Sequence, residues 1–165
     1  MTSRRSFLGI PVEGDITEGA TRVDQKPIEE LRPIMQAVLD DPTIIEFGWR
    51  QYTPYFNDGD PCEFSAYGLW VRTDADEGDD IDEYDLEVDS HRTLGKVPWV
   101  YSEEARKYER GTYEGPDEAR YDRCQALDGA IQGGAFEHVL LEAFGDHASI
   151  TVRREGIEVD FYAHD

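Results

Sequence analysis

The sequence predicts an α+β fold, a two-layer domain in which a four- or five-stranded, mainly antiparallel sheet carries three or four helices on one face. Three segments with helical spacing of apolar residues and two hairpins rich in β-branched and aromatic residues predict this class. A length of 165 residues with 39% hydrophobic composition suits one core. We expect a loose arm with one short extended piece over residues 1–23, and a single domain over 24–165.

The first helix is predicted from Asp24 toward Pro42. Asp24 is a candidate N-cap, and Pro27 suits a first helical turn. Because Pro33 costs about 3 kcal/mol inside a helix, a late start or a kink is expected there. Apolar residues recur at helical spacing through the segment: Ile28, Leu31, Met35, Val38 and Leu39.

A β-hairpin is predicted next, because β-branched and aromatic residues fill 44–56 and return over 62–71. Between them, residues 57–61 are Asn-Asp-Gly-Asp-Pro, which suit the backbone of a tight reversal. Six large aromatic residues form either the core of this hairpin or an exposed protein-binding face: Trp49, Tyr52, Tyr55, Phe56, Tyr67 and Trp70.

An acidic insertion is predicted at 73–91, where ten carboxylates occur between Thr73 and His91 without a Lys or Arg. Its first half, 74–80, has Ala75 as its only apolar residue and is expected to be a solvated loop. Its second half alternates over 85–89, which predicts an edge strand with Leu86 and Val88 facing inward. Charges on such an edge also discourage unwanted strand pairing, so a purely structural role stays open.

Three further helices and a second hairpin complete the predicted fold. Ser102 is a candidate cap for a short helix that ends at Gly111. Helices are also predicted over 117–132, before Gly133-Gly134, and over 136–144, before Gly145. The second hairpin pairs 150–152 with 157–162 around a turn at 153–156.

Two stretches resemble uncharacterised small acidic proteins of bacteriophages and their bacterial hosts. One is 51–62, Gln-Tyr-Thr-Pro-Tyr-Phe-Asn-Asp-Gly-Asp-Pro-Cys, and the other is the tail from Ala143-Phe-Gly-Asp-His147 to His164-Asp165. The resemblance covers about half of the chain and implies no activity for particular residues. It implies a phage or prophage context, in which a small protein that binds a host enzyme is expected.

The net charge narrows the possible partners. With 37 acidic and 16 basic residues the chain carries a formal charge of −21, which repels nucleic acids and anionic lipid headgroups. We therefore expect no direct nucleic acid and no membrane among the partners, and a basic or nucleic-acid-binding host protein instead. Solubility, or a source that lives at high salt, explains the charge equally without any partner.

The function predicted first is that of a small acidic binding protein, which mimics nucleic acid and inhibits its partner. DNA presents one charge about every 3.4 Å per strand, and alternate residues of a strand lie about 6.6 Å apart. A divalent-cation or small-ligand module and a virion or assembly component are the alternatives. The expected partner-binding residues are Asp76, Glu77, Asp79, Asp80, Asp82, Glu83, Asp85, Glu87 and Asp89.

Motifs for catalysis and metal binding do not emerge from the sequence. A calcium loop that starts at Asp74 would place Gly78 and Asp79 one position out of register. The four His residues lack metal-protease spacing, and no Ser lies in a nucleophile elbow. We therefore expect no enzyme, no catalytic residue, no cofactor and no metal.

Two reduced thiols, Cys62 and Cys124, fit the cytoplasm of a bacterial host. The pair Arg4-Arg5 is similar to an export signal, but Pro11 and Glu13 interrupt the apolar stretch such a signal needs. A monomer or small homo-oligomer is expected.

Overall fold

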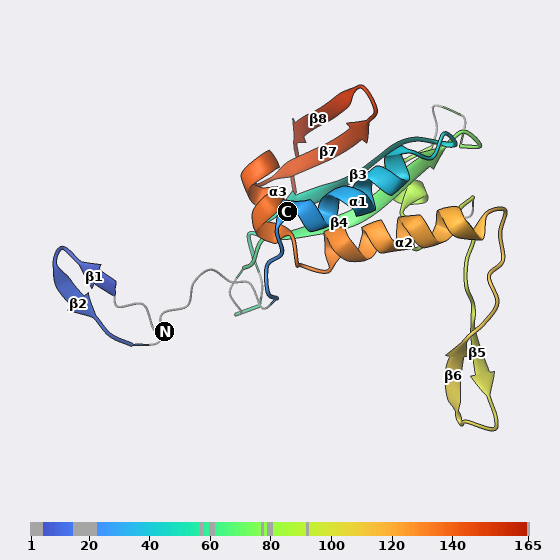
Figure 1. The fold of residues 1–165 in the computed structure, drawn as a ribbon, viewed down its shortest axis with the longest axis horizontal. Coiled ribbons are helices and arrows are strands. Elements are labelled where there is room, and N and C mark those ends of the chain that lie inside the picture. The colour runs from blue at the N-terminus through green and yellow to red at the C-terminus, as the bar shows by residue number, and fades with distance from the viewer. Residues whose placement is uncertain are drawn as a thin grey trace.

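The computed structural model describes residues 5–14, 23–56, 58–59, 62–76, 78, 81–91 and 93–164 (Figure 1). Over these residues the fold class is confirmed as α+β. Three α-helices accompany one four-stranded and two two-stranded antiparallel sheets.

The central sheet has the strand order β4-β3-β7-β8. It joins the two predicted hairpins, β3 (Ile44–Tyr52) with β4 (Ser65–Thr73), and β7 (Ala148–Arg153) with β8 (Gly156–Phe161). The hairpins meet through an antiparallel β3–β7 pairing in which Phe47 lies opposite Val152. Of the first predicted turn, 57–61, the structure describes Asp58 and Gly59.

The helices are α1 (Ile28–Leu39), α2 (Glu118–Gln132) and α3 (Glu137–Phe144). The Asp117 carboxylate caps α2 by accepting a hydrogen bond from the Arg120 N–H at 3.0 Å. Helix α1 starts directly after Pro27 without a side-chain cap and runs through Pro33, so Asp24 does not cap it and the start is not delayed.

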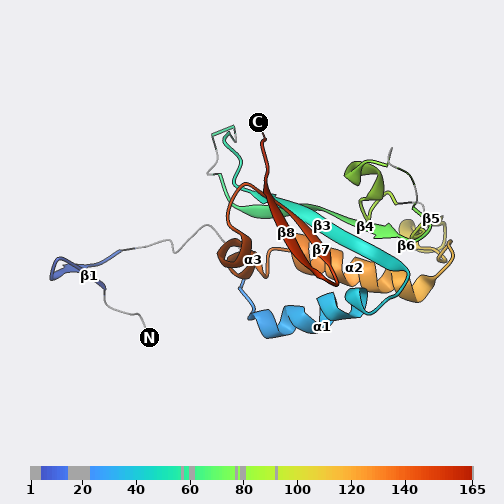
Figure 2. The ribbon, with the colours of Figure 1, turned by 90° about the horizontal axis from the view of Figure 1, so that it is seen from above.

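The core lies between the sheet and the helices, and Figure 2 shows α1 and α2 on the same side of the four-stranded sheet. Phe47, Trp49 and Gln51 of β3 are fully buried. The Gln51 amide accepts from the Trp49 indole N–H at 3.0 Å and donates to the carbonyls of Leu140 and Gly145 at 2.9 and 2.7 Å. This buried amide therefore ties the end of α3 to the central strand.

The helix predicted over 102–111 is wrong. That segment belongs to a β-hairpin, β5 (Trp99–Ser102) with β6 (Lys107–Arg110), which projects away from the body (Figure 1). The Ser102 hydroxyl does accept from a backbone N–H three residues on, that of Ala105, but it does so within the hairpin turn. The β propensity of Trp99, Val100 and Tyr101 explains the strand.

The N-terminal arm also contains more structure than predicted. Strands β1 (Arg5–Phe7) and β2 (Ile10–Val12) form a small hairpin, which Figures 1 and 2 show apart from the body. Leu8 and Gly9 in its turn have φ values of 52° and 80°, as a two-residue hairpin turn requires.

Candidate functional site

The second half of the acidic insertion is held against the edge of the central sheet. The Val88 N–H donates to the Leu69 carbonyl at 2.9 Å, and Glu87 forms a bridge with Trp70 of β4. Leu86 and Val88 are both buried, as their inward-facing positions predicted. Glu87 between them, and Asp85 and Asp89 on either side, are consequently carried by an anchored backbone.

The edge strand predicted at 85–89 is wrong in its geometry. Glu83–Leu86 form a 3₁₀ helix, η1. The Asp82 carboxylate accepts from the Tyr84 N–H at 3.0 Å, and the Asp85 carboxylate accepts from the Asp82 N–H at 3.4 Å. This capping box provides acceptors for backbone N–H groups at the start of the turn, so they need no neighbouring strand. The alternation of apolar and acidic residues over 85–89 gave no sign of it. The regular spacing of carboxylates along a strand, on which the mimicry prediction depended, is therefore absent here.

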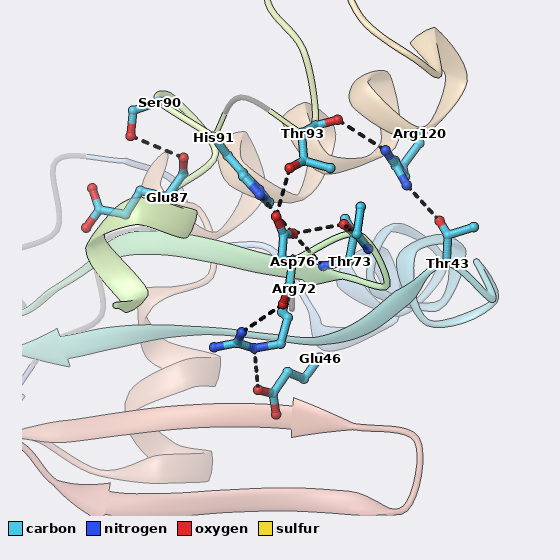
Figure 3. A network of polar contacts seen from close by, with 11 residues as sticks. Thr43, Glu46, Arg72, Thr73, Asp76, Glu87, Ser90, His91, Thr93 and Arg120 are labelled. Atoms are coloured by element: carbon cyan, nitrogen blue, oxygen red, sulfur yellow. Dashed lines mark hydrogen bonds and ion pairs between the residues drawn. The ribbon is translucent and has the colours of Figure 1, made fainter. Parts of the chain in front are cut away.

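Asp76, one of the predicted partner-binding residues, lies in the interior. Its Oδ2 accepts from the N–H and hydroxyl of Thr73 at 2.9 and 2.8 Å, and His91 Nε2 lies 2.9 Å away. Its Oδ1 accepts from the Thr93 hydroxyl at 2.8 Å (Figure 3). Burial alone would raise the pKa of this carboxyl, but hydrogen bonds from His91, Thr73 and Thr93 outweigh it and lower the pKa.

Arg120 extends this network to α2. Its guanidinium donates to the Thr43 hydroxyl at 2.9 Å and to the Thr93 carbonyl at 3.2 Å (Figure 3). The start of the acidic insertion is thereby joined to Thr43, directly before β3, and to the first turn of α2. Asp76 serves to hold the loop in place.

Glu87 pairs with Arg50, whose guanidinium lies 2.7 Å from its carboxylate. The same guanidinium stacks over the Tyr84 ring at 4.4 Å. Arg50 passes so close to Gly68 that a Cβ there would lie 2.0 Å from its Nη2. These contacts orient η1 on the face of the sheet opposite to α1 and α2.

The remaining acids form the surface that we call the acidic ridge: Asp82, Glu83, Asp85, Glu87 and Asp89. Asp82, Asp85 and Asp89 are exposed, and Tyr84 is 57% exposed between them. Burial, reinforced by the charges of Asp82 and Glu46, raises the pKa of Glu83 although Arg50 opposes the shift. The predicted site residues Glu77, Asp79 and Asp80 lie outside the described residues.

The ridge continues onto α2 through Asp128. Burial raises the pKa of this carboxyl, and the charges of Asp89 and Glu87 add to the shift while the Gln132 amide opposes it. The charges of two ridge acids thus act on a carboxyl of α2 that lies about forty positions further along the chain.

A second group, which we call the aromatic cluster, consists of Tyr52, Tyr55, Tyr67, His147, Tyr162 and His164. His147 Nδ1 and His164 Nε2 lie 2.6 Å apart, and the Tyr55 ring stacks on that of His164 at 4.5 Å. Tyr52 contacts Tyr67 at 4.7 Å between ring centroids. Of the six aromatic residues singled out in the sequence, Trp49 and Trp70 are buried, whereas Tyr55 and Phe56 are exposed.

The thiols and the metal-ligating residues give no further site. Burial raises the pKa of the Cys124 thiol to about 12, so it is a core group and not a nucleophile. Over the described ranges, no group of three or more His, Cys, Asp or Glu is arranged to hold a metal ion. Among the helices described, none is long and apolar enough to cross a membrane.

Comparison with known protein families, with curated proteins and with solved structures gives no match for this chain. Functional inference therefore depends on the ridge and on the surfaces around it.

Proposed function

We propose that this chain is a non-enzymatic binding protein whose acidic ridge docks on a basic surface of another protein. The observation that carries the proposal is the anchoring of the ridge. Asp82, Asp85 and Asp89 are exposed on and beside a capped 3₁₀ turn, while Leu86 at the end of that turn and Val88 beyond it are buried. A surface ordered before binding loses less conformational entropy on association than a mobile acidic loop.

Tyr84 supplies an anchor within the ridge. It is more than half exposed, and its ring is supported from one side by Arg50. Tyrosine contributes a large contact area at low entropy cost, and it is enriched among the residues that dominate binding energies. Basic groups of the partner would pair with Asp82, Asp85 and Asp89 around it.

We take the domain as two layers, with helices on one face of the sheet and the ridge over part of the other. The partner we propose is a host protein with a nucleic-acid-binding groove, met in the bacterial cytoplasm in a phage or prophage setting. Competition with nucleic acid would come from the density of negative charge, since a regular phosphate-like spacing is missing from η1.

The test is affinity capture from bacterial lysate, followed by calorimetry with the purified partner. The ridge variant is Asp82→Asn, Asp85→Asn and Asp89→Asn, which removes three charges while Asn keeps the cap. We expect its affinity to fall at least about tenfold. Raising the salt from about 50 to about 300 mM should weaken the wild-type complex, because exposed charges are screened.

A matched control removes the same number of charges from α1 or just after it: Glu29→Gln, Glu30→Gln and Asp40→Asn. These residues are exposed on the helical side of the sheet. The control should bind as the wild type does. Equal losses in both variants would mean that net charge alone drives binding, and normal binding by the ridge variant would remove the ridge as the interface.

A further inference from the structure

The last strand of the sheet, β8, leaves an apolar face uncovered. Ile157, Val159 and Phe161 lie opposite the buried residues Val152, Ile150 and Ala148 of β7, so they share the helical face of the sheet. They are nonetheless 49%, 45% and 75% exposed. Within the part of the chain that the structure describes, β8 is also the end of the sheet and pairs with β7 alone.

A groove continues this surface. It has a volume of about 230 Å³ and lies between α1, α3 and Ile157, with Leu31, Met35, Val139 and Phe144 among its apolar lining. An open strand edge beside an apolar groove favours pairing with another strand, which proteins normally prevent with charge, proline or a covering element.

The N-terminal hairpin has the complementary features. Phe7 pairs with Ile10, and Arg5 with Val12, which places three apolar residues on one face of the hairpin. Phe7 and Ile10 are 69% and 64% exposed. Because a two-stranded hairpin is at best marginally stable alone, this face requires a cover.

Charge favours this hairpin over a second β8 as the occupant. Symmetric antiparallel pairing of two β8 strands about Val159 would place Glu158 opposite Asp160 of the other copy, and like charges directly opposite are destabilising. Residues 1–12, by contrast, contain Arg4 and Arg5 and no acid. Pairing of this segment with β8 therefore places no carboxylate opposite Glu158 or Asp160, and the repulsion that remains is the one between two whole chains of net charge −21.

The hairpin has one edge that suits pairing. Phe7 and Ile10 flank the two-residue turn and pair through backbone hydrogen bonds. At the next pair, Ser6 and Pro11, the outer edge of each strand is therefore where a backbone N–H would point. Pro11 has no N–H, which blocks the outer edge of β2. The outer edge of β1 keeps its donor at Ser6.

The arm leaves the body beside the groove. The Lys26 N–H donates to the Ala135 carbonyl at 2.8 Å, and the Gln25 amide donates to the Gly134 carbonyl at 2.7 Å, at the junction of α2 and α3. The eleven steps from Val12 to Val23 span at most about 40 Å, which allows the hairpin to reach a neighbouring molecule.

We propose that the N-terminal hairpin of one copy docks on β8 and the adjoining groove of a second copy, with β1 beside β8, and that the exchange is reciprocal. In one copy alone the hairpin stands away from the body and both apolar surfaces stay open (Figures 1 and 2). Docking would extend the central sheet and bring Phe7, Ile10 and Val12 into line with the apolar row of β8.

The first measurement is the mass in solution by light scattering at increasing protein and salt concentration. The mass should double from 18.8 kDa, and salt should favour the dimer because it screens the repulsion between two strongly acidic chains. Deletion of residues 1–14 should leave a monomer. Tyr108→Glu, at an exposed position of the other projecting hairpin, is the matched control and should still dimerise.

Complementation tests the reciprocal exchange. Val159→Glu keeps the hairpin but blocks its receiving strand, whereas the deletion keeps the receiving strand but lacks the hairpin. Each should be monomeric alone, and their mixture should give a heterodimer. If Val159→Glu fails to fold, Ser6→Pro provides the test on the donor side, because it removes the outward N–H and should likewise lower dimer formation.

A wild-type protein that stays monomeric at all salt concentrations would overturn the proposal. Hydrogen exchange then separates two cases: protected hairpin amides mean docking within one chain, and rapid exchange means an undocked arm. Either result leaves the proposed function of the acidic ridge standing, because the variant that lacks residues 1–14 should bind the partner of the ridge normally. Salt also distinguishes the two complexes, since it should weaken the complex with the partner and strengthen the dimer.

Discussion

Asp76 shows how one side chain fixes the start of the acidic insertion. Its two carboxylate oxygens receive the Thr73 N–H and the hydroxyls of Thr73 and Thr93, with His91 at 2.9 Å, while the residue is only 8% exposed. A buried carboxylate with this many donors stabilises the fold only while it is charged.

Asp76→Asn should therefore destabilise the protein by about 2–4 kcal/mol, because the amide supplies one acceptor oxygen where the carboxylate supplies two. The folded pKa of Asp76 lies below its ordinary value, so its contribution is present above the unfolded pKa and is lost as pH falls through the folded pKa. Urea unfolding between about pH 7 and pH 3 should show a flatter acid dependence in the variant.

Asp74→Asn is the control for this change, because Asp74 is exposed beside the same turn. It should alter the free energy of unfolding by less than about 0.5 kcal/mol. If the free energy of unfolding of Asp76→Asn depends on pH as that of the wild type does, Asp76 is not the group responsible for the loss of stability in acid.

Strand β4 contains an extra residue relative to β3, and this irregularity lies where Arg50 reaches toward the acidic ridge. The register shifts between Gly48 and Arg50, where Gly48 faces Trp70 and Arg50 faces Tyr67. Gly68 lies in that irregularity with φ of 63°, in the space next to the guanidinium. Glycine is required there both for its backbone and for its missing side chain.

Gly68→Ala should cost about 1–3 kcal/mol, because it combines left-handed backbone strain with displacement of the Arg50–Glu87 pair. Thermal or urea unfolding measures this loss. Gly156→Ala in the β7–β8 hairpin provides the comparison, since a Cβ there meets no atom within 4 Å. Equal effects at the two positions would contradict the proposed role of the irregularity.

The elements predicted from the sequence are those with local signals. Helices α2 and α3 were recognisable from Asp117, Gly133 and Gly145 at their ends, and both hairpins of the central sheet from their turns. The β5–β6 hairpin was missed because Ser102-Glu103-Glu104 matches a helix start equally well as a hairpin turn.

The candidate site was predictable only in part. The exposed acids of the ridge follow from the run of carboxylates over 73–91, and the inward-facing Leu86 and Val88 follow from the alternation over 85–89. The Arg50–Glu87 pair joins positions 37 apart, and the His147–His164 contact depends on where the chain runs after β8. Such pairings are set by the tertiary structure, which no short window of sequence contains.

For the whole molecule, the charge of −21 opposes compaction as well as attracting partners. Several acids are neutralised internally, such as Glu46, which pairs with Arg72 at 3.1 Å and Arg153 at 2.8 Å. The exposed acids of the ridge have no such compensation from Lys or Arg within 73–91.

Added salt should therefore stabilise the folded chain. Screening of the excess charge should raise the free energy of unfolding by about 1–2 kcal/mol, which corresponds to a rise in Tm of roughly 2–8 °C for a chain of this length. Differential scanning calorimetry of the 1–14 deletion, which removes any effect of dimerisation, measures it. A Tm that is independent of salt would mean that the charges are already balanced within the fold.

The projecting β5–β6 hairpin has a spectroscopic consequence. It carries Trp99, which is 69% exposed, whereas Trp49 and Trp70, the other two tryptophans of the chain, are buried. The fluorescence of the native protein therefore comes from two buried tryptophans, which are shielded from a neutral quencher such as acrylamide, and from Trp99, which the quencher can reach. Anything that covers the hairpin changes the quenchable part of the emission, and unfolding exposes the shielded part. The unlabelled protein can thus report contact at this hairpin separately from loss of its core.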